Sequence, residues 1–368
     1  MKTIVVSAVN LRKGGTLAIL DGCLQTLSSM ARKGDYRIVA IVHKRNLANY
    51  EGIDYIELEW SVRSWLHRLW CEYVTMYGIS KKIGDIDLWL SLHDTTPRVK
   101  ARRQAVYCHN SYPFFRWKWY HLLLNYRIVC FALFTNFIYR ANLYRNNFVI
   151  VQQEWFRKAF TQMFNLCHNQ IIVFPPPQTD MRPIADHRLN DGKFCFIYPA
   201  YPDVHKNLEC LCEAAKLLEE EVGADKFEVM LTIDRTANAY TRMINRKWGR
   251  VSSLRFCGFL SQDRLYDLYA QANCLVFPSK AETWGLPISE FAQSGRYMLL
   301  ADLPYAHESA GGSKQTAFFN PEKLEELKNL MRKAMEHDIK AFKVVEPTTP
   351  KEPVARSWQE LFTELMRS

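Results

Sequence analysis

The sequence predicts an α/β protein with two parallel sheets, each covered by helices on both faces. Short β-branched and apolar runs alternate with helix-length segments along the chain, which is typical of strands buried in parallel sheets. With 368 residues, the chain exceeds the size at which a single core usually stops growing. A stiff Phe-Pro-Pro-Pro sequence at 174–177 and the polar stretch after it separate two such series. We therefore expect domains at 1–178 and 179–352, and a C-terminal helix within 353–368 that packs back towards the first domain.

The first half begins with the most regular of these units. A β-branched run from Thr3 to Val9 leads into Gly14-Gly15, and a segment with helical apolar spacing follows. This order predicts a strand, a glycine turn and a helix. Further strands are predicted at Tyr36–His43, Asp87–Leu92, Gln104–His109 and Phe148–Gln153.

The second half repeats the alternation. Its strand-like runs read FCFIYPA, EVMLTI, LRFCGF, ANCLVFPS, YMLLAD and TAFFN, each beside a plausible helix. Ligands of doubly wound sheets bind outside the carboxyl ends of the strands. We therefore expect two Rossmann-like domains with the functional site between them.

The formal charge of +10 indicates an anionic partner. Nucleic acid is disfavoured, because the cations are dispersed and no zinc-finger, helix-turn-helix, RRM or KH signature occurs. Anionic lipid and anionic small molecules remain as partners.

The ten cysteines stand singly, without a CxxC pair or a signal peptide, and are expected to be reduced core residues of a cytoplasmic protein. No Asp-x-Asp motif or cluster with metal-ligand spacing is present, so no metal site is expected.

The most informative stretch runs from Val276 to Glu290 and reads as a strand, a loop and a short helix. Proline is tolerated in the first turn of a helix and glycine in the left-handed position that ends one, so Pro287 and Gly295 place the helix near 287–294. Its amino terminus offers free N–H groups to a phosphate or an oxyanion. Glu282 lies in the loop and Glu290 in the helix, so both can face one cleft.

This stretch resembles the signature of the retaining family 4 glycosyltransferases, group 1 enzymes with the two-domain GT-B fold, in which two glutamates flank a Phe-Gly-Leu-Pro-like loop. Trp284 stands here in place of the phenylalanine. The resemblance implies that Glu282 binds the hydroxyls of the donor sugar and that Glu290 binds the ribose of the nucleotide. The loop Thr283, Trp284, Gly285, Leu286 and Pro287 would offer backbone donors to the sugar and the diphosphate.

Upstream, Lys206-Asn207 opens a predicted helix and matches the position of the family's diphosphate-binding lysine. One departure concerns the family's arginine, whose position is occupied by Ala200. This loss removes a bidentate phosphate ligand. Either another cation replaces it, with His205 and Arg235 as candidates, or leaving-group stabilisation is weaker than usual.

Two further regions follow the family pattern. Gly258 ends a predicted strand, and Phe259 and Leu260 after it would border the nucleobase, although each is also an ordinary turn or core residue. In the first half, His93, Asp94 and His109-Asn110 close two strands. The resemblance implies that His109 faces the donor sugar or the acceptor, and a purely structural role is equally open.

The catalytic candidates are thus Glu282, Lys206 and His109. The donor-binding candidates are Gly15, Lys206, Asn207, Gly258, Phe259, Leu260, Thr283, Trp284, Gly285, Leu286, Pro287 and Glu290. Gly14-Gly15 is the weakest of these signals, because glycine turns are common without ligands.

Residues 113–145, the basic aromatic segment, are dense in aromatic side chains and cations and contain no carboxylate. Their longest uncharged run, Ile128 to Tyr139, is shorter than a bilayer-spanning helix requires. One interpretation is an interfacial helix in which Phe115, Trp117 and Trp119, beside Arg116, Lys118 and Arg127, meet anionic lipid, an area that Trp60, Trp65 and Trp70 could extend. The other is ordinary packing within the acceptor domain.

The resemblance implies a retaining transfer of a hexose from a nucleoside diphosphate sugar to a glycan or lipid-linked glycan. The expected setting is the synthesis of bacterial lipopolysaccharide, capsule or exopolysaccharide, in the cytoplasm or on the inner face of the membrane. Lys206 and the helix amino terminus would replace a divalent metal. The alternatives are a sugar-nucleotide epimerase, a phosphorylase, or a catalytically silent subunit of the same fold.

Overall fold

The computed structural model describes residues 1–12, 14–176, 182–186 and 192–367. The chain separates into two compact units. The first comprises Met1–Asn110, Phe134–Thr179 and Pro350–Ser368, and the second comprises Ser111–Leu133 and Asp180–Thr349. The predicted boundary at 178/179 lies outside the described residues. The predicted ranges and the observed units differ at Ser111–Leu133, which belongs to the second unit.

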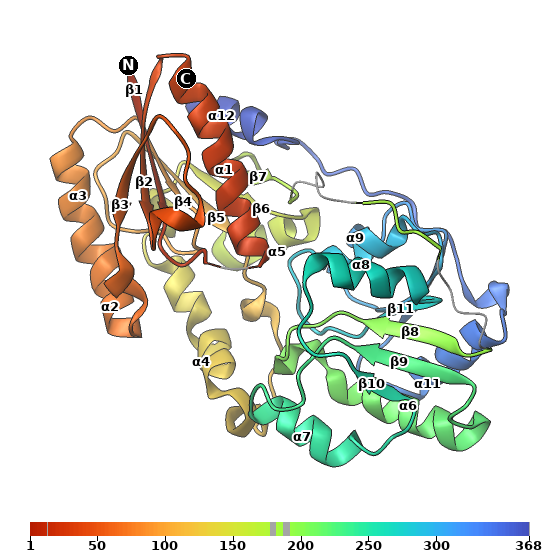
Figure 1. Ribbon diagram of the computed structural model, residues 1–368. Helices are drawn as coiled ribbons and strands as arrows, with labels where there is room; N and C mark the ends of the chain where they lie inside the picture. Colours follow the sequence, from red (N-terminus) through yellow and green to blue (C-terminus); the bar gives the residue numbers. More distant parts are fainter. Residues whose placement is uncertain (13, 177–181, 187–191, 368) are drawn as a thin grey trace. The chain divides into compact units, whose positions relative to one another are not determined.

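The first unit contains a seven-stranded parallel sheet in the order β3-β2-β1-β4-β5-β6-β7, labelled in Figure 1. All five predicted strands of the first half are present within one to two residues of their expected ends. Two short strands, β3 and β7, were not predicted. The strands are β1 Lys2–Ala8, β2 Tyr36–Val42, β3 Ile53–Glu57, β4 Leu88–Ser91, β5 Arg103–Cys108, β6 Phe148–Val151 and β7 Ile171–Val173.

Alternating side chains of β1 serve the two faces of this sheet. Ile4, Val6 and Ala8 join one buried cluster with α1 and the C-terminal helix α12. Val5 and Val9 join a second cluster with Cys71 and Met76 on the opposite face. The sheet is therefore covered on both faces, as its continuously apolar strands require. The helices with residues in this unit are α1 Gly15–Arg32, α2 Trp65–Trp70, α3 Met76–Ile83, α4 His121–Arg140, α5 Glu154–Phe164 and α12 Trp358–Met366.

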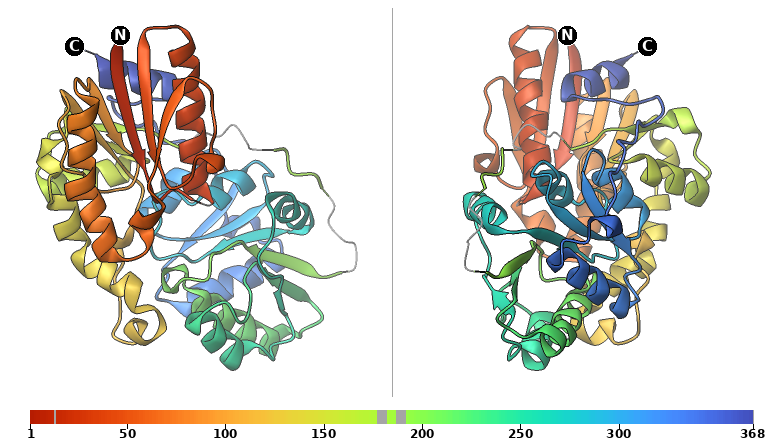
Figure 2. Two further views of the ribbon diagram at one scale, coloured as in Figure 1. Left: turned by 60° about the vertical axis from the view of Figure 1, so that its left-hand side comes forward. Right: turned by 90° about the vertical axis from the view of Figure 1, so that its right-hand side faces the viewer.

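The C-terminal helix α12 packs on α1, as Figure 2 shows in two views. Trp358 lies so close to Gly22 that a Cβ atom there would stand 2.8 Å from the indole nitrogen. Just before the helix, the amide of Ala355 donates to the carbonyl of Val173 in β7 at 2.9 Å. The end of the chain is thus part of the first core.

The second unit contains a six-stranded parallel sheet in the order β10-β9-β8-β11-β12-β13, with α8 and α9 on one face and α6, α7 and α11 on the other (Figure 1). All six predicted strands are present. They are β8 Phe194–Tyr198, β9 Phe227–Leu231, β10 Leu254–Phe256, β11 Cys274–Phe277, β12 Tyr297–Ala301 and β13 Gln315–Phe319. The helices are α6 Leu208–Val222, α7 Ala239–Trp248, α8 Gln262–Gln271, α9 Leu286–Ala292, α10 Pro304–Ser309 and α11 Leu324–Met335.

Helix α4 passes from the second unit into the first, with non-helical dihedral angles at Asn125. Residues 121–145 are long and apolar enough to cross a membrane by length and composition alone, and most of their apolar part is not buried inside the protein. The shortness of the uncharged run therefore does not by itself exclude a span. A single helix of this kind is weak evidence for one.

The ten cysteines are free thiols, as expected from their spacing. The expectation that all of them are core residues is wrong for Cys130 and Cys167, which are exposed, and Cys257 is only partly buried.

Candidate functional site

The second sheet reverses its strand order between β8 and β11, and the candidate residues follow these two strands. Lys206 comes after β8, in a 3-10 turn over Val204–Lys206, and Glu282 lies in the loop between β11 and α9. In sheets of this kind, a crevice for ligands forms at such a switch point. The topology therefore places the two charged groups where a ligand would bind.

Lys206 and Glu282 form an ion pair through Nζ and Oε1. The same carboxylate oxygen accepts a hydrogen bond from Ser279 Oγ at 2.7 Å, and the Lys206 ammonium stands 5.8 Å from the centre of the Phe277 ring. Both side chains are largely buried. The pair thus presents a fixed positive and a fixed negative group side by side.

The loop after Glu282 is held by its own hydrogen bonds. The indole N–H of Trp284 donates to Ser289 Oγ at 2.9 Å, and the Trp284 carbonyl accepts a hydrogen bond from Ser309. Gly285 has a left-handed backbone with φ 80°, where a Cβ atom would stand 3.2 Å from Ile288 Cδ1. Glycine is therefore required at this turn.

Helix α9 begins as predicted, with Pro287 in its first turn, and Gly295 has the expected positive φ of 66°. Glu290 projects from this helix and accepts a hydrogen bond from the hydroxyl of Tyr269 at 2.9 Å. Burial raises the pKa of Glu290, and this hydrogen bond opposes the rise. A carboxylate held in this way can accept hydrogen bonds from ligand hydroxyls.

Asn207 has a left-handed backbone and caps α6. Its side-chain amide is buried and donates to the carbonyls of Pro278 at 3.2 Å and Pro321 at 3.0 Å. These bonds join the loops after β8, β11 and β13. The geometry gives Asn207 a structural task in addition to the predicted role in donor binding, which stays a prediction.

Gly258, Phe259 and Leu260 follow β10. Gly258 has φ 75°, and Phe259 is 80% exposed with its ring 6.4 Å from that of Tyr201. Two exposed aromatic rings at the carboxyl edge of a sheet form a surface on which a base can stack. Tyr201 was not singled out from the sequence.

The missing arginine at Ala200 is not replaced by His205. This imidazole is buried, and burial together with the neighbouring charge of Lys206 lowers its pKa well below the usual value, so it is neutral. Arg235 is exposed, and its guanidinium lies 4.5 Å from the centre of the Phe256 ring. Arg235 therefore stays the candidate of the two.

The first-unit candidates lie at the carboxyl edge of their own sheet. Gly15 begins α1 directly after Gly14, which has φ 60°. The backbone amide of His109 donates a hydrogen bond to Asp94 Oδ1 at 2.7 Å. The Nε2 atom of the His109 imidazole lies 3.4 Å from Asp94 Oδ2. The hydroxyl of Tyr139 donates to Asp94 Oδ1 at 2.9 Å. Asp94 thus fixes the position of the imidazole, whose function stays a prediction.

His93 is a structural residue. It is buried and lies among Ser7, Ser91 and Thr95, and burial lowers its pKa to about 4.

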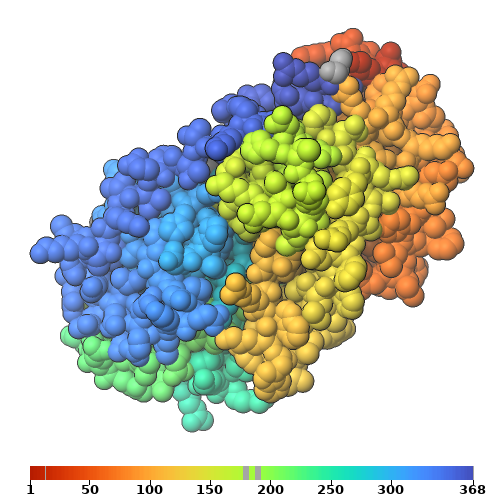
Figure 3. Space-filling model, turned by 180° about the vertical axis from the view of Figure 1, so that it is seen from behind, coloured from red at the N-terminus to blue at the C-terminus, as the bar shows by residue number. Residues whose placement is uncertain are grey.

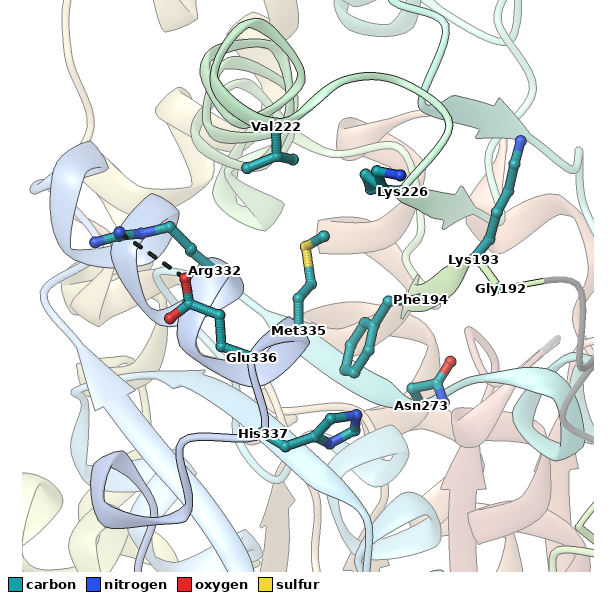
Figure 4. Close-up of a pocket in the computed structure, with 10 residues that line it drawn as sticks. All are labelled: Gly192, Lys193, Phe194, Val222, Lys226, Asn273, Arg332, Met335, Glu336 and His337. Atoms are coloured by element: carbon teal, nitrogen blue, oxygen red, sulfur yellow. Dashed lines mark ion pairs between the residues drawn. The ribbon is translucent and has the colours of Figure 1, made fainter.

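A pocket of about 390 Å³ lies elsewhere in the second unit (Figure 4). It opens at the amino ends of β8 and β9, where Phe194 begins the first of these strands and Lys226 precedes the second. Lys206 and Glu282 follow the carboxyl ends of their strands. The pocket is therefore at the opposite edge of the sheet from the candidate site.

Among the described residues, no group of three or more His, Cys, Asp or Glu side chains is arranged to hold a metal ion.

Residues 182–348 match the model of the family described as glycosyl transferases group 1. A stretch of 133 residues is 31% identical to the serotype-specific mannosyltransferase WbdA of Escherichia coli and covers 35% of this chain. The chain spans only 16% of the length of that relative.

Solved structures share the fold over most of the chain. WaaG, described as a glycosyltransferase involved in lipopolysaccharide biosynthesis, is 12% identical, covers 100% of this chain and 94% of its own, and has a TM-score of 0.61. HepE of Anabaena, solved with UDP-glucose, is 13% identical and also has a TM-score of 0.61. The match covers 100% of this chain and 96% of the HepE chain. The predicted GT-B fold is confirmed.

Proposed function

We propose that the chain is a retaining hexosyltransferase that uses a nucleoside diphosphate sugar, because residues 182–348 match the model of the group 1 glycosyl transferases. The observation that carries the proposal is the pairing of Lys206 and Glu282 at the switch point of the second sheet, with Glu290 on the helix that follows. A cation is the group that binds a diphosphate, and two carboxylates can accept hydrogen bonds from the hydroxyls of a sugar and of a ribose.

Each group has a chemical task in this reaction. The Lys206 ammonium binds the diphosphate and stabilises the charge that develops as the sugar leaves. Glu282 accepts hydrogen bonds from the sugar hydroxyls, and Glu290 accepts them from the ribose. Retention follows if the departing phosphate removes the proton of the incoming hydroxyl on the same face of the sugar.

We propose that this charge stabilisation proceeds without a metal, with Lys206 as the main cation and Arg235 as a second one. The acceptor in the proposal is a glycan or a lipid-linked glycan of a bacterial surface polysaccharide. Support comes from the likeness to WbdA, which is named a mannosyltransferase. HepE binds UDP-glucose in its solved structure, which supports a nucleotide-sugar donor here.

The donor proposal is tested by thermal unfolding with UDP, GDP, ADP, CMP and dTDP, because a ligand that binds the native state raises the melting temperature. We expect one diphosphate to raise it and Lys206→Ala or Glu290→Ala to abolish the rise. Turnover of the matching sugar nucleotide with an acceptor, followed by NMR of the anomeric proton, tests retention. Binding without turnover would instead identify a catalytically silent subunit, and product without acceptor would identify an epimerase.

We further propose that the basic aromatic segment, 113–145, holds the protein on the inner face of an anionic membrane. Leu123 is 76% exposed and Trp119 is 72% exposed. Several other apolar side chains of this segment are exposed as well. Arg116 and Arg127 are exposed beside them, Lys118 is exposed as well but pairs with Glu322, and the segment has no carboxylate. Apolar insertion combined with positive charge is the usual basis of interfacial binding.

Sedimentation with vesicles tests this membrane contact. We expect binding to vesicles that contain anionic lipid and little binding to neutral ones. Leu123→Ser should weaken it severalfold, whereas Ile339→Ser, which changes an apolar residue of similar exposure (70%) outside the segment, should not. Equal binding of both variants would contradict the proposed surface.

A further inference from the structure

The segment Ser111–Leu133, here termed the docked segment, belongs to the second unit although it precedes that unit in sequence. Figure 3 shows the face of the molecule on which it lies beside later residues of the same unit. The side chain of Lys118 pairs with Glu322 at 2.8 Å, and Glu322 also pairs with Lys280 at 2.7 Å. Lys280 lies in the loop that carries Glu282. The docked segment is thus linked to the loop of the candidate site.

Aromatic rings of the docked segment enclose His205. The ring of Tyr112 lies 5.4 Å from the imidazole of His205, and that of Phe115 lies 6.2 Å from it, both edge-on. Phe115 also stacks on His121 at 5.3 Å and is only 4% exposed. The expectation that Phe115 faces lipid is therefore wrong, because it packs inward while Trp119 is exposed.

His205 is held by packing more than by polar contacts. Its side chain is buried, and its Nδ1 atom has no hydrogen-bond partner within the described part of the chain. The position of this ring therefore depends on Tyr112 and Phe115. A buried aromatic contact of this kind contributes through close packing, so removal of one ring leaves space into which the imidazole can move.

The backbone of His205 and Lys206 is hydrogen-bonded to strand β8 and to the loop after strand β11. The carbonyl of His205 accepts a hydrogen bond from the amide of Lys280 at 2.7 Å. The carbonyl of Lys206 accepts one from the hydroxyl of Tyr198, in β8, at 2.8 Å. A shift of His205 would therefore move Lys206 and the loop that leads to Glu282 together. The hydrogen bond from Asn125 to Asp203, at 3.3 Å, holds the start of the same turn.

We propose that the docked segment is a positioning element of the donor site, in which Tyr112 and Phe115 hold the turn that presents Lys206 to a nucleoside diphosphate. This inference rests on the proposed function and names a part of the site that lies outside the family-matched residues 182–348. Phe115 acts through His205 and touches no substrate in this proposal.

Coupling of this kind is reciprocal, so ligand binding at Lys206 must stabilise the docked segment. Hydrogen exchange of the wild-type protein, with and without the diphosphate that raises its melting temperature, measures this directly. We expect at least threefold slower exchange of backbone amides within 111–124 and at the 203–206 turn. Unchanged exchange at 111–124 with bound nucleotide would overturn the inference.

Substitution provides the second test, by calorimetric titration with the same diphosphate. Phe115→Ala should weaken binding about tenfold or more, and Phe115→Leu should restore part of the affinity. Ile339→Ala, at an exposed residue of the same unit outside the segment, should leave it unchanged. Phe164→Leu, at a buried phenylalanine of the first unit, controls for a general loss of stability.

The two tests separate this inference from the proposed function. If no diphosphate binds the wild-type protein, the donor proposal fails and the inference fails with it. If a diphosphate binds and Phe115→Ala binds it as tightly as wild type, only the inference is overturned.

Discussion

The Nζ atom of Lys206 contacts Oε1 of Glu282, so the turns after β8 and β11 are joined by an ion pair at the switch point of the second sheet. The pair is largely buried, and Ser279 adds a hydrogen bond to the carboxylate. A diphosphate that approaches Lys206 must therefore compete with Glu282 for the ammonium group. The pair orients both side chains before any ligand arrives.

Replacement of either partner should reduce turnover far more than folding. We expect Lys206→Met to lower kcat about 100-fold or more, because loss of one preorganised group that stabilises the departing charge typically costs that much. Glu282→Gln should have a similar effect through the lost sugar contact. The measurement is product formation with the donor identified by thermal shift. Lys216→Met, at a half-exposed lysine of α6 that pairs with Glu220, is the matched control, and full activity of Lys206→Met would remove the residue from the mechanism.

Gly285 should resist substitution for backbone reasons. Gly285→Ala places a Cβ at φ 80° and 3.2 Å from Ile288, so we expect a loss of about 1–3 kcal/mol in the free energy of unfolding. Denaturant titration measures it. Gly78→Ala is the control, because Gly78 lies within α3, has no positive φ and has no atom within 4 Å of the new Cβ. That variant should gain a few tenths to about 1 kcal/mol.

Acid should weaken the docked segment through His121. Burial, with help from Lys280 and Lys118, lowers the pKa of His121 to about 4. In the unfolded chain this residue binds a proton near pH 6.5, whereas in the folded chain it stays neutral until about pH 4. The free energy of unfolding therefore falls progressively between about pH 6.5 and about pH 4, by up to about 3 kcal/mol. Burial also lowers the pKa of His205, so this residue too lowers the free energy of unfolding as the pH falls.

Unfolding free energies between pH 7 and pH 4 test this sign. His121→Phe should flatten the pH dependence, since phenylalanine does not titrate. A slope unaffected by His121→Phe would show that other groups cause the acid sensitivity.

Tyr269 should control the pH range over which Glu290 binds a nucleotide. Burial raises the pKa of Glu290, and the hydrogen bond from Tyr269 opposes that rise. Tyr269→Phe should therefore raise this pKa further, so that nucleotide affinity falls at a higher pH on acidification than in wild type. Titrations of the diphosphate at several pH values measure the shift. An unmoved profile would mean that Glu290 does not bind the ligand in its ionised form.

Local chemistry made the second sheet and α9 predictable. The runs of apolar residues defined its strands, and Pro287 and Gly295 fixed the helix between β11 and β12 to within two residues. The strand β3 was missed because its sequence, Ile53–Glu57, contains two carboxylates and lacks a continuous apolar run. The strand β7, Ile171–Val173, was missed because it runs through Phe174 into three prolines, which dominate the local pattern.

Contacts between distant residues were not predictable in the same way. One of the two interpretations of the sequence placed Phe115 against lipid, because cations and tryptophans surround it in sequence. Its partner His205 lies ninety positions later, and no local pattern reports that contact. The partnership of Tyr269 and Glu290 was missed for the same reason, since a tyrosine in a regular helix such as α8 is indistinguishable from a core residue.

The path of the chain between its units has a consequence for protein engineering. The backbone passes from one unit to the other after residues 110, 133, 179 and 349, so neither unit is a continuous piece of the gene. A chimera cut once near residue 180 would leave Phe115 without its own His205 and α1 without its own α12. Exchange of donor specificity with a homologous protein therefore requires two exchanged segments, with residues 111–133 grafted together with 180–349.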